Sequence, residues 1–193
     1  MIERSLVLMK PDAVARGIVG EILHRFERMG LKVIGVKMLH PKKSFVEKHY
    51  SVSEDNLKIM GNKTLEDAKE NGVDPEKVMG TKDPAKLGKM IWQWSVDFLS
   101  SGPVIAFVLE GPHAIANIRT QVGHTLPLKA APGTIRGDYT LDSSYSANIR
   151  NRSIYNLVHA SGNKEEATFE IDLWFKPEDL LDYKRVQDDL YGY

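Results

Sequence analysis

Three short polar clusters interrupt the apolar segments of this 193-residue chain. They are Lys10-Pro11-Asp12, the segment from Arg119 to Thr125, and Gly133-Thr134-Ile135-Arg136-Gly137-Asp138. Lysine and arginine supply positive charge, threonine supplies a hydroxyl donor, and a guanidinium can hold phosphate oxygens in a fork. Brought together by the fold, these residues would bind phosphate without a glycine-rich loop. The sequence contains no GxxxxGK[ST] motif, which argues against a P-loop ATPase.

The elements that must position these clusters follow from the spacing of apolar side chains. Apolar runs predict strands at residues 4–10, 31–39 and 103–110, and helical spacing predicts helices at 18–29, 89–99 and 113–122. Residues 167–175 alternate, with Phe169, Ile171, Leu173 and Phe175 on one face, which predicts a half-buried fourth strand. Ser44 and Glu47 fit a capping box for a short helix that runs to Tyr50. This order indicates an α+β fold with the β-α-β-β-α-β order of ferredoxin-like domains.

Two segments lack the regular spacing of apolar residues that marks these strands and helices. Residues 53–88 are polar, are broken by glycines, and contain the helix-start signals Asp74-Pro75 and Asp83-Pro84. Their low apolar content predicts a helical surface insertion in a single domain of residues 1–193. Residues 124–155 predict a long loop, which is unusual unless it is functional.

Composition excludes several classes of function. Lysine plus arginine and aspartate plus glutamate each number 26, so net charge does not steer the protein to nucleic acid or membrane. No stripe of aromatic and basic residues indicates sequence-specific nucleic-acid binding. There is no cysteine, and no apolar run approaches the roughly 20 residues that span a bilayer. The first residues, MIERSLVLMK, form a segment too short and too charged for us to expect a signal peptide. We therefore expect a soluble, cytoplasmic protein.

The segment Asn156-Leu157-Val158-His159-Ala160-Ser161, followed by Glu170-Ile171-Asp172-Leu173-Trp174-Phe175, resembles the active-site signature of nucleoside diphosphate kinases. Lys10-Pro11-Asp12, His49-Tyr50, Ser101-Gly102-Pro103-Val104 and Pro132–Asp138 match the same family in the same order. The resemblance runs from about residue 4 to residue 183. The insertions at 53–88 and near 140–152 are similar to the longer, archaeal-type members. The resemblance implies a ferredoxin-like, four-stranded antiparallel sheet covered by helices.

The resemblance also implies a ping-pong reaction, in which the γ-phosphate of a triphosphate such as ATP or GTP passes through a phosphorylated histidine to a nucleoside diphosphate. His159 matches the nucleophile, which in this family attacks through Nδ1. Neutral imidazole suits that role because its ordinary pKa is about 6.5. Glu170 matches the carboxylate that orients the ring, with Ser161 nearby. The positions that bind phosphates match Lys10, Arg119, Thr125 and Arg136. Asn156 matches the residue that contacts the sugar, and Tyr50 matches an aromatic residue beside the histidine and phosphates.

Two positions depart from the family pattern. The residue that stacks on the base aligns with Ile91 or with its neighbour Trp92, and the nearby insertion leaves both possible. Gly162 follows the active-site serine where an acidic residue is common. We therefore expect Mg²⁺ to be the cofactor but to be held chiefly by the nucleotide phosphates, with no protein metal ligand. His49 is expected only to pack beside Tyr50.

Two other functional classes remain open from sequence. A nucleotide-binding module on the same scaffold would keep its affinity without His159, and a purely structural role would leave Lys10 and its arginine partners unexplained. The resemblance implies a homo-oligomer, with a hexamer expected and a tetramer or dimer as alternatives. The segment 124–140 matches the part that contributes to trimer contacts.

Overall fold

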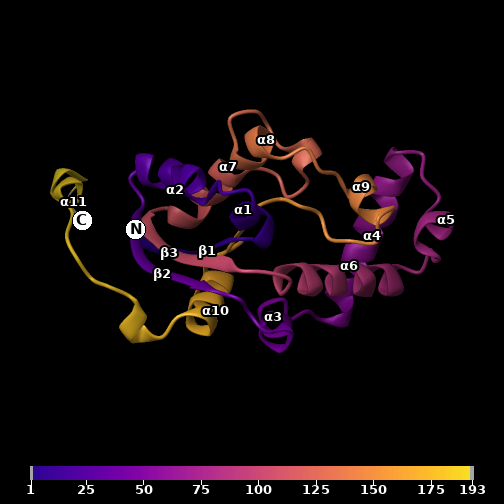
Figure 1. Cartoon of the computed structure of the whole chain (residues 1–193), viewed down its shortest axis with the longest axis horizontal. Helices are drawn as coiled ribbons and strands as arrows, with labels where there is room; N and C mark the ends of the chain where they lie inside the picture. Colours follow the sequence, from indigo (N-terminus) through magenta and orange to yellow (C-terminus); the bar gives the residue numbers. More distant parts are fainter. Residues whose placement is uncertain (1, 192–193) are drawn as a thin grey trace.

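The computed structural model describes residues 2–191, and at its centre lies a four-stranded antiparallel sheet (Figure 1). Residues 1, 192 and 193, which the single-domain prediction includes, lie outside the described residues. The strand order is β2-β3-β1-β4, with bounds β1 (Ile2–Met9), β2 (Lys32–Leu39), β3 (Val104–Pro112) and β4 (Val158–Ala160). Strands β1, β2 and β3 and the ferredoxin-like α+β fold were predicted from the sequence, and the structure confirms them.

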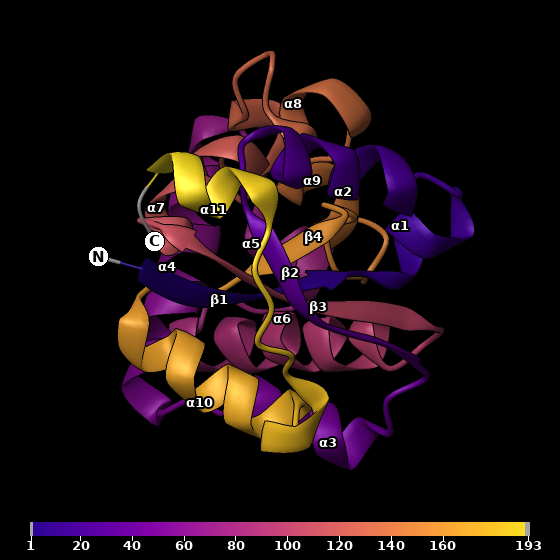
Figure 2. The same cartoon turned by 90° about the vertical axis from the view of Figure 1, so that its left-hand side faces the viewer.

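Both faces of the sheet are covered because strand residues alternate between two apolar layers. Val7 and Met9 of β1 pack with α2 (Val19–Arg28) and α7 (Ala114–Val122). Leu6 and Leu8 pack on the opposite face with α3 (Lys43–His49), α6 (Pro84–Leu99) and α10 (Lys164–Trp174). Figure 2 shows α10, α3 and α6 on one side of the sheet and α2, α7 and α8 on the other.

The predicted strand at 167–175 is wrong, because these residues belong to helix α10 and its C-terminal cap. Asn163 caps the helix by accepting the backbone N–H of Glu166. The buried residues recur at helical spacing, at Ala167, Glu170, Ile171 and Trp174. Phe169, which alternation placed on the buried face, is half exposed. The fourth strand is instead the short β4, which contains the predicted nucleophile.

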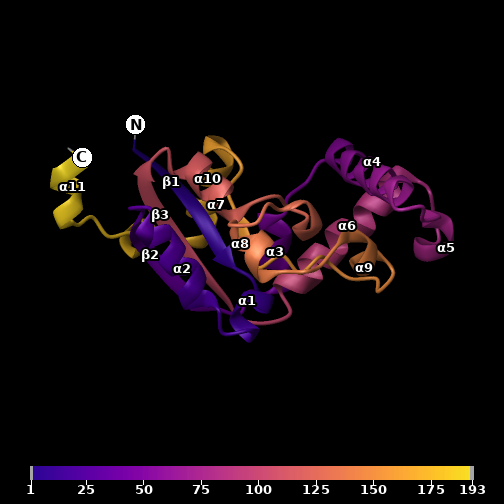
Figure 3. The ribbon, with the colours of Figure 1, turned by 90° about the horizontal axis from the view of Figure 1, so that it is seen from above.

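The polar insertion forms a helical hairpin with the start of α6. It contains α4 (Glu54–Glu70) and α5 (Pro75–Met79), and Asp74 and Asp83 cap α5 and α6 as predicted. Gly61 lets α4 approach α6, since a Cβ at this position would lie 1.8 Å from the Pro84 carbonyl oxygen. Figures 1 and 3 show α4 and α5 at the opposite end of the molecule from the C-terminus.

Three smaller features complete the chain before its C-terminal segment. The predicted capping box is wrong, because Lys42 precedes α3 and its side chain makes no capping hydrogen bond. The segment 124–155 contains short helices, η1 (Pro127–Lys129), α8 (Ile135–Tyr139) and α9 (Ser144–Asn148), in place of a uniform loop. Helix α1 (Pro11–Ala15) directly follows β1.

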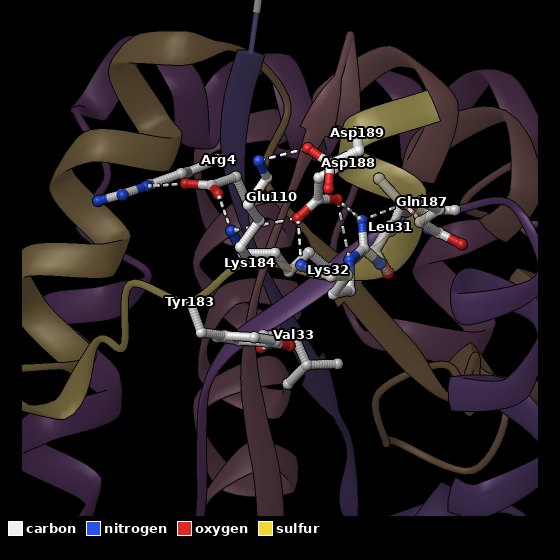
Figure 4. A network of polar contacts seen from close by, with 12 residues as sticks. Arg4, Leu31, Lys32, Val33, Glu110, Tyr183, Lys184, Gln187, Asp188 and Asp189 are labelled. Carbon is white, nitrogen blue, oxygen red and sulfur yellow. Dashed lines mark hydrogen bonds and ion pairs between the residues drawn. The ribbon is translucent and has the colours of Figure 1, made fainter. Parts of the chain in front are cut away.

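The C-terminal segment runs along β2, an edge strand of the sheet. After η2 (Pro177–Asp179), the Leu181 N–H donates to the Ile34 carbonyl at 2.7 Å, and α11 (Val186–Tyr191) ends the described chain. The Arg185 guanidinium donates to the carbonyls of Gly30 and Leu31 at 2.9 and 3.0 Å. Figure 4 shows the surrounding charges, in which Lys32 lies between Glu110 and Asp188. These contacts cover part of an edge that would otherwise expose unpaired backbone groups. No helix among residues 2–191 has both the length and the apolar character needed to cross a membrane.

Candidate active site

His159 lies in the middle of β4, opposite Leu8 of β1. Its Nε2 is 2.8 Å from Glu170 Oε1, and the Ser161 hydroxyl donates to Glu170 Oε2 at 2.6 Å. A carboxylate only accepts hydrogen bonds, so a neutral His159 carries its proton on Nε2 and keeps the Nδ1 lone pair free. The side chain is 19% exposed, which leaves the ring accessible to a ligand.

A cavity of about 970 Å³ opens in front of His159. Its volume lies at the upper end of the range typical for small-molecule sites. Every predicted site residue lines it: Lys10, Tyr50, Ile91, Trp92, Arg119, Thr125, Arg136, Asn156, His159 and Glu170. The structure therefore brings together residues that lie up to 160 positions apart in the sequence.

Lys10 is held at the cavity by a chain of hydrogen bonds. Its Nζ donates to Asn156 Oδ1 at 2.7 Å, and Asn156 Nδ2 donates to the Thr125 carbonyl at 2.8 Å. Burial and, to a smaller extent, the positive charge of Arg136 together lower the pKa of Lys10 to about 8, while the negative charge of Asp12 opposes both effects. Among residues 2–191 the Lys10 ammonium forms no ion pair, and Asp12 offsets its positive surroundings only in part, so a bound phosphate would supply the missing negative charge.

The two predicted arginines differ in how they are held. Arg136 donates to three backbone carbonyls, those of Asn156, Gly123 and Val158, at 3.1, 2.9 and 2.6 Å. Burial and the nearby Arg119 charge lower the pKa of Arg136 to about 10. Within residues 2–191, by contrast, no hydrogen bond or ion pair engages the Arg119 guanidinium. Arg136 therefore contributes a fixed charge, and Arg119 has its N–H groups available for a ligand.

Aromatic side chains form the wall beside His159. The Tyr50 ring centroid is 6.4 Å from that of His159, and burial together with the Glu170 charge raises the pKa of Tyr50, so its hydroxyl stays protonated. The Trp92 indole N–H donates to the Tyr50 carbonyl at 2.8 Å. Trp92 thereby anchors Tyr50, while both Ile91 and Trp92 line the cavity.

Sequence reasoning missed a second group of cavity residues. The α4 side chains Met60, Lys63 and Asp67 line the cavity, as do Arg152 and Ile154 from the segment after α9. Both predicted insertions therefore contribute walls to the same cavity. Only the helical period of α4 and the glycines that bring it against α6 could have indicated this arrangement.

A ferredoxin-like sheet that presents a histidine to a nucleotide-sized cavity lined by buried cations defines a class of phosphate-transferring proteins. The family model described as nucleoside diphosphate kinase matches residues 3–64 and 84–180. The nucleoside diphosphate kinase of Pyrobaculum aerophilum is 44% identical over 181 residues, which are 94% of this chain and 99% of that protein. That of Pyrococcus furiosus is 38% identical over 190 residues, or 98% and 93% of the two chains.

Solved structures agree with these sequence matches. The crystal structure of the NDP kinase from Pyrobaculum aerophilum has a TM-score of 0.90 at 43% identity and covers 94% of this chain and 100% of its own. A transition-state mimic of the Borrelia burgdorferi enzyme with bound vanadate and ADP has a TM-score of 0.78 at 35% identity, covering 97% and 95%. The chain belongs to the nucleoside diphosphate kinase family. It is a nucleotide-binding kinase that transfers phosphate from nucleoside triphosphates to nucleoside diphosphates, as the resemblance to longer archaeal members implied.

Proposed function

We propose that this chain carries out its phosphate transfer in two half-reactions through a phosphorylated His159. The observation that carries this proposal is the His159–Glu170 hydrogen bond of 2.8 Å, which leaves Nδ1 free at a cavity lined by Lys10, Arg119 and Arg136. In the first half-reaction, Nδ1 attacks the γ-phosphorus, a phosphorus–nitrogen bond forms, and the bond to the bridging oxygen breaks. The nucleoside diphosphate leaves with that electron pair, and the second half-reaction reverses these steps with another diphosphate.

The cavity residues stabilise the charge on the transferring phosphoryl group. In phosphoryl transfer, catalysis comes mainly from positioning and from fixed positive charge. Lys10 and Arg136 are already held in place by hydrogen bonds, so little reorganisation is needed when the phosphate enters. Arg119 and Thr125 complete the phosphate contacts in this proposal.

The nucleoside occupies the outer part of the cavity. Asn156, which is held between Lys10 and Thr125, would contact the sugar, and Tyr50 would lie beside the phosphates. The base would stack on the wall formed by Ile91 and Trp92. Stacking without base-edge readout is consistent with ATP, GTP and other nucleotides all serving as substrates.

Mg²⁺ fits this site as an ion carried by the nucleotide. The two α10 carboxylates that line the cavity are already engaged: Glu170 by His159 and Ser161, and Glu166 by the N–H groups of Gly162 and Asn163. The nearby His49, His159 and Glu170 lie close enough to hold a metal, but their nitrogen-rich donor set is not the oxygen set that Mg²⁺ prefers. When bound to the phosphates, Mg²⁺ would neutralise their negative charge.

The chain would act as one domain that assembles with copies of itself in the cytoplasm. Residues 53–88 build no separate core in the structure, and α4 packs on α6 and lines the cavity. The family model omits residues 65–83, which lie inside this segment. Leu128 of η1, in the segment 124–140, is 72% exposed and would be covered by a neighbouring subunit in such an assembly. Light-scattering mass of the full chain should report a hexamer, and a monomer would contradict the assembly proposal.

The function is tested by following phosphate on the protein. The full chain incubated with γ-labelled ATP should form an acid-labile phosphoprotein that passes its label to added nucleoside diphosphates. His159→Ala should remove both signals, and its circular dichroism should show an intact fold. Absence of label from the native protein, or label that persists in His159→Ala, would overturn the proposal.

A further inference from the structure

His49, the last residue of α3, lies directly beside His159, and the reaction proposed above gives it no role. Its side chain is 0% exposed. The ring packs edge-on against His159 with centroids 4.6 Å apart, and against Trp174 at 5.5 Å. Because His49 is buried beside the predicted nucleophile, the ring nitrogen of His49 that carries the proton affects the hydrogen bonds available to His159.

The contact with Trp174 determines which nitrogen of His49 carries the proton. The Trp174 indole nitrogen is 3.3 Å from His49 Nδ1. An indole N–H can only donate, so Nδ1 must accept, and a neutral His49 then carries its proton on Nε2. His49 Nε2 is a buried polar atom that lacks a partner within residues 2–191. An unsatisfied buried donor is unfavourable, so the Trp174 hydrogen bond holds His49 in this tautomer although the tautomer leaves the Nε2–H without a partner.

The second neighbour of His49 Nδ1 is the carboxylate that orients the predicted nucleophile. Nδ1 is 3.8 Å from Glu170 Oε1, the same oxygen that lies 2.8 Å from His159 Nε2. A proton on His49 Nδ1 would point at this oxygen and compete with the His159 N–H. His159 could then move its proton to Nδ1, which would remove the lone pair needed for attack on phosphorus.

We infer that His49 and Trp174 form a positioning pair: the Trp174 N–H occupies His49 Nδ1 and thereby reserves Glu170 Oε1 for the His159 Nε2–H. This inference rests on the proposed role of His159 as nucleophile. Figure 2 shows the arrangement that makes it possible, with α3 and α10 on the same side of the sheet.

The charges around His49 act in the same direction. Burial lowers the pKa of His49, and repulsion from His159, when that ring is protonated, and from Lys10 lowers it further. Tyr50, which packs on the ring at 4.7 Å, stays protonated and uncharged. Glu170 is the nearby group that would attract a proton to Nδ1, and the Trp174 N–H lies in the way.

The tautomer can be read directly from nitrogen NMR spectra of histidine-labelled full-length protein without nucleotide. In the native protein both His49 and His159 should carry their protons on Nε2. In Trp174→Phe, which removes the N–H and keeps an aromatic ring, His49 should gain a proton at Nδ1 and His159 should show a mixture of tautomers. An unchanged His159 tautomer in Trp174→Phe would overturn the inference whatever the activity of the protein.

A double-mutant cycle gives the kinetic test. Trp174→Phe should slow His159 phosphorylation by about tenfold, which is the effect of losing the charge-assisted hydrogen bond from His159 to Glu170. The acid limb of the pH profile of this rate should move to higher pH, because His49 can then take a proton at Nδ1 and compete for Glu170. His49→Asn has an amide oxygen that can accept the same N–H and has no titratable nitrogen. In that background Trp174→Phe should cost less than about twofold.

A packing role for the pair predicts another result, namely the same loss from Trp174→Phe in both backgrounds with no shift of the acid limb. That result would overturn the inference. The matched packing control is Phe45→Leu, because Phe45 contacts the Trp174 ring edge-on at 4.9 Å and makes no hydrogen bond to His49. It should lower the melting temperature and leave the tautomers and the acid limb unchanged. Native protein that labels at His159 while the cycle is additive would retain the proposed function and lose only this inference.

Discussion

Lys10 links the pH dependence of stability to the pH dependence of nucleotide binding. Its pKa falls from 10.5 to about 8 in the folded protein because the ammonium is buried beside Arg136. In the unfolded chain the same group titrates near its ordinary value. Between these pH values the unfolded state binds more protons than the native state, so stability must rise with pH. Below pH 8 the full unfavourable contribution of the buried charge is present in the native protein.

The size of the effect follows from the two pKa values. One pKa unit corresponds to about 1.4 kcal/mol, so a fall from 10.5 to about 8 corresponds to on the order of 3 kcal/mol. We therefore expect the free energy of unfolding of native protein to rise by up to this amount, relative to Lys10→Met, between pH 8 and pH 10.5. Methionine has a similar length and cannot titrate, so groups shared by the two proteins cancel in the comparison.

Urea unfolding of both proteins across this pH range, with and without ADP, provides the assay. Bound phosphate should hold the proton on Lys10, so saturating ADP should abolish the pH-dependent difference. The affinity of native protein for ADP should in turn weaken above pH 8, whereas that of Lys10→Met should be weak throughout. A difference in unfolding free energy that stays constant from pH 7 to pH 10.5 would refute the argument that Lys10 is a desolvated cation.

Two further substitutions test the elements that shape the cavity. Gly61→Ala places a Cβ against the Pro84 carbonyl and should separate α4 from α6, lowering the free energy of unfolding by about 1–3 kcal/mol. The matched control is Gly20→Ala in α2, where open space surrounds the glycine, and it should be neutral or stabilising by about 0.5–1 kcal/mol. Equal melting temperatures for the two variants would contradict the close packing of α4 on α6. Glu170→Gln keeps an acceptor for His159 and removes its charge, so the phosphorylation rate should fall by about tenfold with little change in melting temperature, and an unchanged rate in stopped-flow measurements would show that the charge is dispensable.

Much of the framework was predictable because its signals are local. The strands β1, β2 and β3 are apolar runs, and α2 and α7 show a single helical period, so both kinds of element follow from nearby residues. Residues 167–175 could not be assigned from local signals, because their apolar residues fit both the two-residue period of a strand and the 3.6-residue period of a helix. Alternation selects Phe169 and Phe175, while helical spacing selects Glu170 and Trp174, and only the layer that covers the segment decides between them.

By itself, the sequence determined which side chains are available for chemistry: His159, its carboxylate Glu170, and the Lys and Arg residues whose motifs occur in family order. Tertiary structure alone decided that His49 meets Trp174, that Arg136 is held by backbone carbonyls, and that α4 lines the cavity. The physical reason is that a residue's type sets what its side chain can donate, accept or titrate. Partners, burial and the position of a proton depend on contacts between segments far apart in the chain, which no local pattern encodes.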